Sequence, residues 1–228
     1  MNINKHLILL FSVLFFLFAV SVSSGCFRKN ESDVKSVVRN ELDQLKNLDS
    51  ETTQKYIPYT ELFPDATENT DLTDEINETF SLFFRKFNYK ISDVIVGTAN
   101  HSATVSVKLT TIDSKVLARD FKAELLRTQI TESAQAQKGN IKDSSRSLEA
   151  HYLILNHLLN TNDYDTAETD CNIQLVNTGN DKKEKWKIQC TNSLEDDLVG
   201  GLIADLADPD ILSPEDTLTV YLDTLQKL

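Results

Sequence analysis

Several segments of the chain place apolar residues at helical spacing and are predicted to be amphipathic helices. The first starts at Asp33 and continues through Leu45, with Ser32 or Asp33 as its N-cap, and a shorter helix over 49–56 ends before Pro58. The apolar positions of the first helix are Val34, Val37, Val38, Leu42 and Leu45.

A third helix is predicted from about Thr73, and it carries four phenylalanines within eight residues. Core packing explains this aromatic face better than a ligand-binding box, because large apolar side chains at helical spacing are usually buried. The preceding loop, 58–71, is expected to tuck Tyr59 and Phe63 onto the core. The apolar face of the helix consists of Ile76, Phe80, Phe83, Phe84 and Phe87.

Two more helices are predicted on either side of a polar segment. One starts at Asp113 or Ser114 and runs to about residue 135, and the other covers 148–160. Residues 134–147 between them are polar and are predicted to form a mobile loop.

Two helices close the chain. A capping box at Ser193 predicts a helix over 194–206, and a serine followed by proline predicts a second over 214–227. Gly200 and Gly201 lie within the first of these and lack the spacing of a phosphate-binding loop. They are interpreted as a place where this helix packs closely against a sheet.

Strict alternation of apolar and polar residues predicts a first β-hairpin over 89–96 and 103–110, with its turn at 97–100. Such alternation means that one face is buried and the other faces water, which is typical of an antiparallel sheet. The residues predicted to face the core are Ala103, Val105, Val107 and Leu109.

A second hairpin is predicted over 167–175 and 185–190. When its turn is centred between residues 180 and 181, three pairs of like-facing residues come opposite each other, whereas a slip of one residue would mismatch the faces. The opposed pairs are Leu175 with Trp186, Ile173 with Ile188, and Cys171 with Cys190.

This register leads to a disulfide hypothesis for Cys171 and Cys190. The two Cβ atoms would lie within reach of each other, and export would remove the chain from reducing thiol pools. The alternative is two buried free thiols, since directly opposed strand positions are slightly too far apart for relaxed disulfide geometry. The third cysteine, Cys26, lies near the N-terminus.

The first 25 residues have the pattern of an export signal. They contain one basic residue with a fixed charge, Lys5, then an apolar run over 7–22, and small residues up to Gly25. Small residues followed at once by Cys26 resemble the lipobox of bacterial lipoproteins, although Ser23 stands where that family usually has leucine. The resemblance implies cleavage before Cys26 and diacylation of its thiol.

An uncleaved membrane anchor and a secretory signal with an incidental cysteine are the alternatives for this segment. On the lipoprotein interpretation, residues 1–25 are a signal peptide, 26–32 a short tether and 33–228 a single α+β domain. The mature protein would then lie on the extracytoplasmic side of the cell membrane, held there by its lipid.

Composition narrows the functional classes. The chain has 228 residues, 40% hydrophobic and 25% charged, which is typical of a globular protein. Its 35 acidic residues against 23 Lys and Arg give a net charge of −12, which argues against nucleic acid as a partner.

The whole pattern resembles a family of Gram-positive lipoproteins of unknown function, over roughly residues 33–205. The motifs that carry the resemblance are structural: Ala103-Thr104-Val105, Trp186-Lys187-Ile188 and the helix with Gly200 and Gly201. The resemblance implies an α+β fold of the nuclear-transport-factor-2-like, cystatin-like kind, in which helices pack into a curved antiparallel sheet built from two hairpins. A recurring helix–hairpin order, at 72–112 and 148–190, leaves an internal duplication open.

No catalytic, cofactor or metal residues are predicted. His151 and His157 are six residues apart on one helix and do not face one metal ion as an i, i+4 pair would. The acidic clusters 195–197 and 205–210 lack the spacing and glycine of a calcium loop. No nucleophile motif is present, while converging carboxylates stay open.

Two functions from different classes fit the sequence. The favoured one is a non-enzymatic binding or envelope-interaction module that accepts a small molecule, peptide or protein on the concave sheet face or in an apolar slot beneath Tyr59 and Phe63. The alternative is an extracytoplasmic hydrolase that uses carboxylates in the sheet cavity. An open pocket lined by two or more Asp, Glu or His residues would favour the hydrolase.

Overall fold

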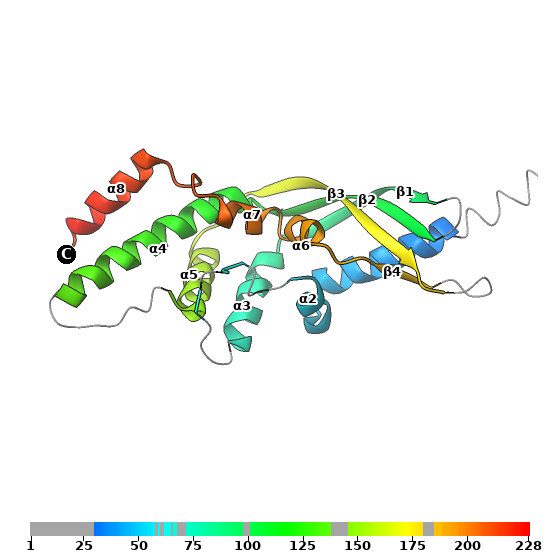
Figure 1. Cartoon of the computed structure of the whole chain (residues 1–228), viewed down its shortest axis with the longest axis horizontal. Helices are drawn as coiled ribbons and strands as arrows, with labels where there is room; N and C mark the ends of the chain where they lie inside the picture. Colours follow the sequence, from blue (N-terminus) through cyan, green and yellow to red (C-terminus); the bar gives the residue numbers. More distant parts are fainter. Residues whose placement is uncertain are drawn as a thin grey trace, which may run out of the picture. The chain divides into compact units, whose positions relative to one another are not determined.

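The computed structural model describes residues 30–57, 59, 62–64, 66–67, 72–97, 101–137, 146–179 and 185–228. These residues form two compact units. The first unit contains the residues up to Asn40 together with Ile91–Ser106 and Asn172–Gln189, and the second contains Glu41–Lys90, Val107–Cys171 and Cys190–Leu228. All the helices labelled in Figure 1 belong to the second unit.

Four strands form one open antiparallel sheet in the order β1-β2-β3-β4, as predicted for an α+β protein with two hairpins. The strands are β1 (Asn88–Val96), β2 (Ser102–Ile112), β3 (Thr166–Asn177) and β4 (Trp186–Ile188). The predicted alternation is confirmed, since one face of β2 and β3 is buried. The buried side chains are Ala103, Val105, Val107, Leu109, Cys171, Ile173 and Leu175.

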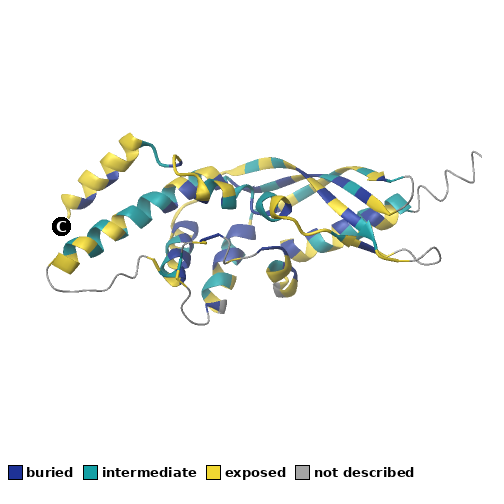
Figure 2. Ribbon diagram, in the orientation of Figure 1, coloured by how far each residue is buried: buried dark blue, intermediate teal, exposed yellow. Residues whose placement is uncertain are grey.

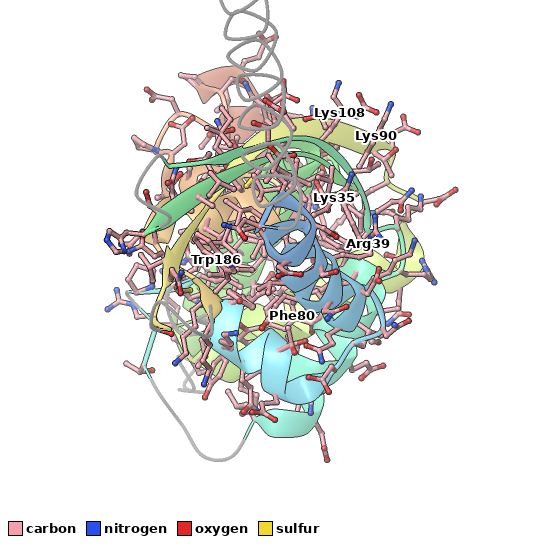
Figure 3. The ribbon with its side chains drawn as sticks, turned by 90° about the vertical axis from the view of Figure 1, so that its right-hand side faces the viewer. Lys35, Arg39, Phe80, Lys90, Lys108 and Trp186 are labelled. Carbon is pink, nitrogen blue, oxygen red and sulfur yellow. The ribbon has the colours of Figure 1, made fainter. Side chains whose placement is uncertain are left out.

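The opposite face of the sheet is polar, and its side chains bridge neighbouring strands. Ser106 donates to Asn172 at 2.9 Å, and within the second unit Lys108 pairs with Glu168 at 3.1 Å. Figure 3 shows Lys108 projecting away from the ribbon. The Glu168 carboxylate raises the pKa of Lys108, so this surface lysine already has an anionic partner.

The predicted helices before the sheet are present. An N-terminal helix is described over 30–46, α2 covers Ser50–Tyr56 with Asp49 as its N-cap, and α3 covers Thr73–Phe84. Phe87 lies beyond the end of α3 but is buried with the other phenylalanines. Of the two loop aromatics expected on the core, Phe63 is buried whereas Tyr59 is 37% exposed.

Three long helices of the second unit also match their predicted positions. They are α4 (Ser114–Gln137), α5 (Leu148–Thr161) and α8 (Pro214–Leu225). α5 packs against α3 and α4, and α8 lies along α4 (Figure 1). Figure 2 shows α3 and α5 with much buried surface and α8 largely exposed. Most of the predicted mobile loop, residues 138–145, lies outside the described residues.

The predicted register of the second hairpin is wrong by two residues. Leu175 pairs with Ile188 instead of Trp186, and β4 has only three residues. The cause is local: the Asn177 side chain accepts hydrogen bonds from the backbone N–H groups of Gly179 and Lys185. Apolar alternation alone does not reveal where this side chain ends the strand pairing. Because the register differs from the predicted one by two residues, an even number, apolar residues still lie opposite apolar residues.

In the observed register, Cys171 and Cys190 are no longer at opposed positions of the two strands, and no disulfide joins them. Cys171 is buried, as predicted, and lies against the Asp197 carboxylate. Cys190 is exposed instead of facing the core, and its Sγ lies 3.0 Å from Glu195 Oε1. The structure therefore contains no bond between Cys171 and Cys190.

The predicted helix over 194–206 is two short helices, α6 (Asn192–Leu198) and α7 (Leu202–Ala207). Gly200 and Gly201 separate them with φ angles of 68° and 90°, which favour glycine. The expected close approach to the sheet is confirmed, because a Cβ on Gly200 would lie 2.2 Å from Thr111 Oγ1 of β2. The predicted cap Ser193 is also wrong, since Thr191 caps α6.

Within the described residues, no helix combines the length and the apolarity that a bilayer span requires. The proposed signal peptide and Cys26 lie outside these residues.

Candidate functional site

A cavity of about 550 Å³ lies within the second unit, where α4, α5 and α7 meet the loop around Phe63. Nine of its lining side chains are apolar, and four are polar or basic. The apolar residues are Leu62, Phe63, Pro64, Ala66, Phe121, Leu125, Ile203, Leu206 and Ala207, and the others are Lys122, Gln129, Arg146 and His151.

Helix α4 supplies one wall of the cavity. Phe121, Leu125 and Gln129 are spaced four apart and so share one face, and Lys122 lies beside them. The helix begins where Asp113 accepts a hydrogen bond from the Val116 N–H, as the sequence predicts for its cap. Its first turns pack into the core, so this wall is anchored at one end.

Helix α7 forms another wall of the cavity, and the side chains of Asp196 and Ser114 hold its start in place. Asp196 Oδ1 accepts hydrogen bonds from the N–H groups of Ile203 and Ala204, which caps the start of α7. The Ser114 hydroxyl lies 2.7 Å from Asp205 Oδ2 and 2.6 Å from the Gly200 carbonyl oxygen. These contacts connect α7 to the first residue of α4.

The loop around Phe63 is attached to the start of α5. Thr67 donates its N–H to the Arg146 carbonyl oxygen at 2.9 Å, and the Leu148 N–H donates to the Thr67 carbonyl oxygen at 3.1 Å. Ser147 caps α5 by accepting a hydrogen bond from the Ala150 N–H. These bonds bring Arg146 to the same cavity as Phe63, although the two residues lie far apart in the sequence.

His151 of α5 lines the cavity and packs against two aromatic rings. Its ring centroid is 4.8 Å from that of Phe63 and 5.6 Å from that of Phe121. The residue is buried, whereas His157 on the same helix is exposed. Among the described residues, no group of three His, Cys, Asp or Glu side chains could hold a metal ion.

The described residues of the cavity are mostly apolar. They include one histidine and neither Asp nor Glu, so no pair of carboxylates faces a substrate there. The sequence predicted an apolar slot near Phe63, and this residue lines the cavity. It gave no signal for Lys122 or Arg146, because only the fold shows which basic residues border an apolar space.

Comparisons of the chain with protein-family models, with curated proteins and with solved structures give no match.

Proposed function

We propose that this protein is a lipid-anchored extracytoplasmic module that binds a small, largely apolar molecule in the cavity between α4, α5 and α7. The observation that carries the proposal is the cavity itself, about 550 Å³ with nine apolar lining residues. Ligand sites in proteins have volumes of roughly 300–1,000 Å³ and mostly apolar walls with a few polar groups.

A binding role without catalysis is the better match to this site. Carboxylate-dependent hydrolysis needs a facing acid pair, and the described lining offers no Asp or Glu. The concave sheet face, the other candidate surface, presents the buried side chains of β2 and β3. The cavity is therefore the site at which a small molecule is expected.

The anchor is part of the same proposal and rests on the sequence. The apolar run over 7–22 and the small residues before Cys26 support cleavage and acylation at that cysteine. The open four-stranded sheet with its helices is compatible with a nuclear-transport-factor-2-like fold and with the lipoprotein family that the sequence resembles. Mass spectrometry of the membrane-extracted protein should find an acylated N-terminal Cys26, and Cys26→Ala should abolish the acylation.

Photolabelling tests the cavity. The full chain would be placed in phospholipid nanodiscs with a decanol that carries a diazirine, a neutral probe with an apolar chain. We expect labelled peptides from α4 and α7 after irradiation. Ala207→Trp places a large ring on the cavity wall and should reduce this labelling, whereas Ala204→Trp, at an equally exposed position of the same helix that does not line the cavity, should retain it.

Two results would contradict the proposal: labelling that avoids α4 and α7, or labelling that survives Ala207→Trp unchanged while the variant melts like the wild type.

A further inference from the structure

The charged residues that line the cavity differ in sign from the net charge of the chain. The protein carries 35 acidic residues against 23 Lys and Arg, yet the described lining contains Lys122 and Arg146 and no acid. Such a local excess of positive charge raises the concentration of anions at a site. The described lining therefore combines apolar walls with two basic side chains.

Lys122 differs from the other basic residues of α4 near the cavity. Arg119 pairs with Asp120 at 3.3 Å, and Arg127 pairs with Glu124 at 2.8 Å. Lys122 is half-buried beside Phe121, and among the described residues it forms no ion pair. A cation partly removed from water gains stability when an anion approaches it.

Arg146, which directly precedes the N-cap of α5, also lines the cavity. Arg146 is exposed to solvent. A guanidinium also binds carboxylates and phosphates through its several N–H donors. The two cations thus mark the polar part of the site.

We propose that the ligand is an amphiphile with an alkyl chain and one anionic head group, and that Lys122 binds the head group while the apolar walls hold the chain. This inference rests on the proposed binding function. It identifies the class of ligand and assigns Lys122 as the residue that selects for negative charge. Arg146 is a second basic residue in the lining of the same cavity.

The experiment compares two photoreactive probes with the same ten-carbon chain and the same diazirine, decanoate and decanol. Both are titrated on the full chain in identical nanodiscs, and labelling of the α4 and α7 peptides gives the half-saturating concentration of each. Because every variant is measured in the same discs, partitioning of a probe into lipid cancels when variants are compared.

The variants are Lys122→Gln, Lys122→Arg and the matched control Lys115→Gln. Lys115 is on the same helix, also forms no ion pair within the described chain, but is exposed and does not line the cavity. Lys122→Gln should raise the half-saturating concentration of decanoate about tenfold, as expected for loss of one charge-assisted hydrogen bond. It should leave decanol unchanged.

Lys122→Arg should retain the preference for decanoate, and Lys115→Gln should behave as the wild type. Equal effects of Lys122→Gln and Lys115→Gln would overturn the assignment, because only the net charge would then matter. Equal loss of decanoate and decanol in Lys122→Gln would also overturn it. If decanol labels the cavity but decanoate shows no dependence on Lys122, the inference fails and the binding function stands. If neither probe labels the cavity, both fail.

Discussion

Two apolar regions of the second unit use similar side chains and pack them differently. Between α3 and α5, Phe80, Phe84 and Tyr152 are almost fully buried and their rings touch one another. Beside α4, Phe121 is equally buried, but the space next to it is a cavity. Phe63 joins the two regions, since its ring lies 5.1 Å from that of Phe121 and 5.5 Å from that of Tyr152.

The difference shows that burial and filling are separate properties. Apolar residues at helical spacing are buried in both regions, but the α3–α5 cluster brings its rings together, whereas the side chains beside α4 border a cavity. A closely packed cluster contributes to stability, because its side chains have full van der Waals contact. Around a cavity, side chains lack part of this van der Waals contact, and a bound ligand would supply it. Substitutions in the two regions should therefore have different effects.

The largest loss of stability is expected for Phe84→Ala in the filled cluster. Phe84 is 2% exposed and its ring contacts those of Phe80, Phe83 and Phe87. Its removal should lower the free energy of unfolding by about 3–5 kcal/mol, measured by urea denaturation. Decanol labelling of the cavity under native conditions should remain, because Phe84 does not line it. A loss below about 1 kcal/mol would show that the cluster is not closely packed.

A smaller loss of stability is expected at Gly200 and Gly201, which connect α6 to α7. Gly200→Ala puts a Cβ 2.2 Å from Thr111 Oγ1 in a left-handed backbone, which should cost about 2–4 kcal/mol in urea denaturation. Gly201→Ala is the matched control, since its Cβ would meet nothing nearer than 3.7 Å. It should cost only the backbone penalty, about 1–2 kcal/mol.

The contact with Thr111 can be tested separately. Adding Gly200→Ala to Thr111→Ala should cost clearly less than Gly200→Ala costs in the wild type, because the hydroxyl at 2.2 Å is gone and only the Thr111 Cβ at 3.1 Å remains close. If Gly200→Ala costs the same with and without Thr111, the close approach to β2 is not the reason for glycine at this position.

These positions also show how far the sequence determines the fold. Alternation correctly identified the buried face of β2, because period-two burial depends only on which face meets the core. The Ser213 cap of α8 was correct for a similar reason, since its hydrogen bond is local. The predicted register of β3 and β4 was wrong because it depends on hydrogen bonds of the Asn177 side chain. The break between α6 and α7 was also missed, because the sequence does not show that Gly200 and Gly201 have positive φ angles.

The cavity was only partly predictable. Phe63 was expected near an apolar slot, and it lines the cavity, whereas Tyr59 does not. The lining comes from four separate segments, and periodicity within each segment says nothing about the volume left between them. Lys122 looks in sequence like any charged residue of an exposed helix face. Only the packing of α7 against α4 makes it part of an apolar site.

On the hollow side, Leu125→Ala should have a much smaller effect than Phe84→Ala. Leu125 is half-buried and faces the cavity, so its methyl groups make few contacts with other side chains, and their removal loses little packing. We expect a loss of about 1 kcal/mol in urea denaturation, with altered decanol labelling of α4. A loss as large as that of Phe84→Ala would mean that this region is filled, and the contrast between the two regions would not hold.

The smallest effect on stability is expected at the thiols, which repeat the contrast between packed and open positions. Iodoacetamide at pH 8 should alkylate exposed Cys190 without changing stability, while buried Cys171 should react only in urea. Burial, followed by the Asp197 charge, raises the pKa of Cys171 to about 12 from 9.0 in the unfolded chain. Its contribution to stability is thus complete below pH 9 and is lost as pH rises towards 12. Peptide mapping distinguishes the two thiols, and Cys190→Ser should remove the fast reaction. Equal rates at both cysteines, or a non-reduced peptide that links them, would contradict the two free thiols of the structure.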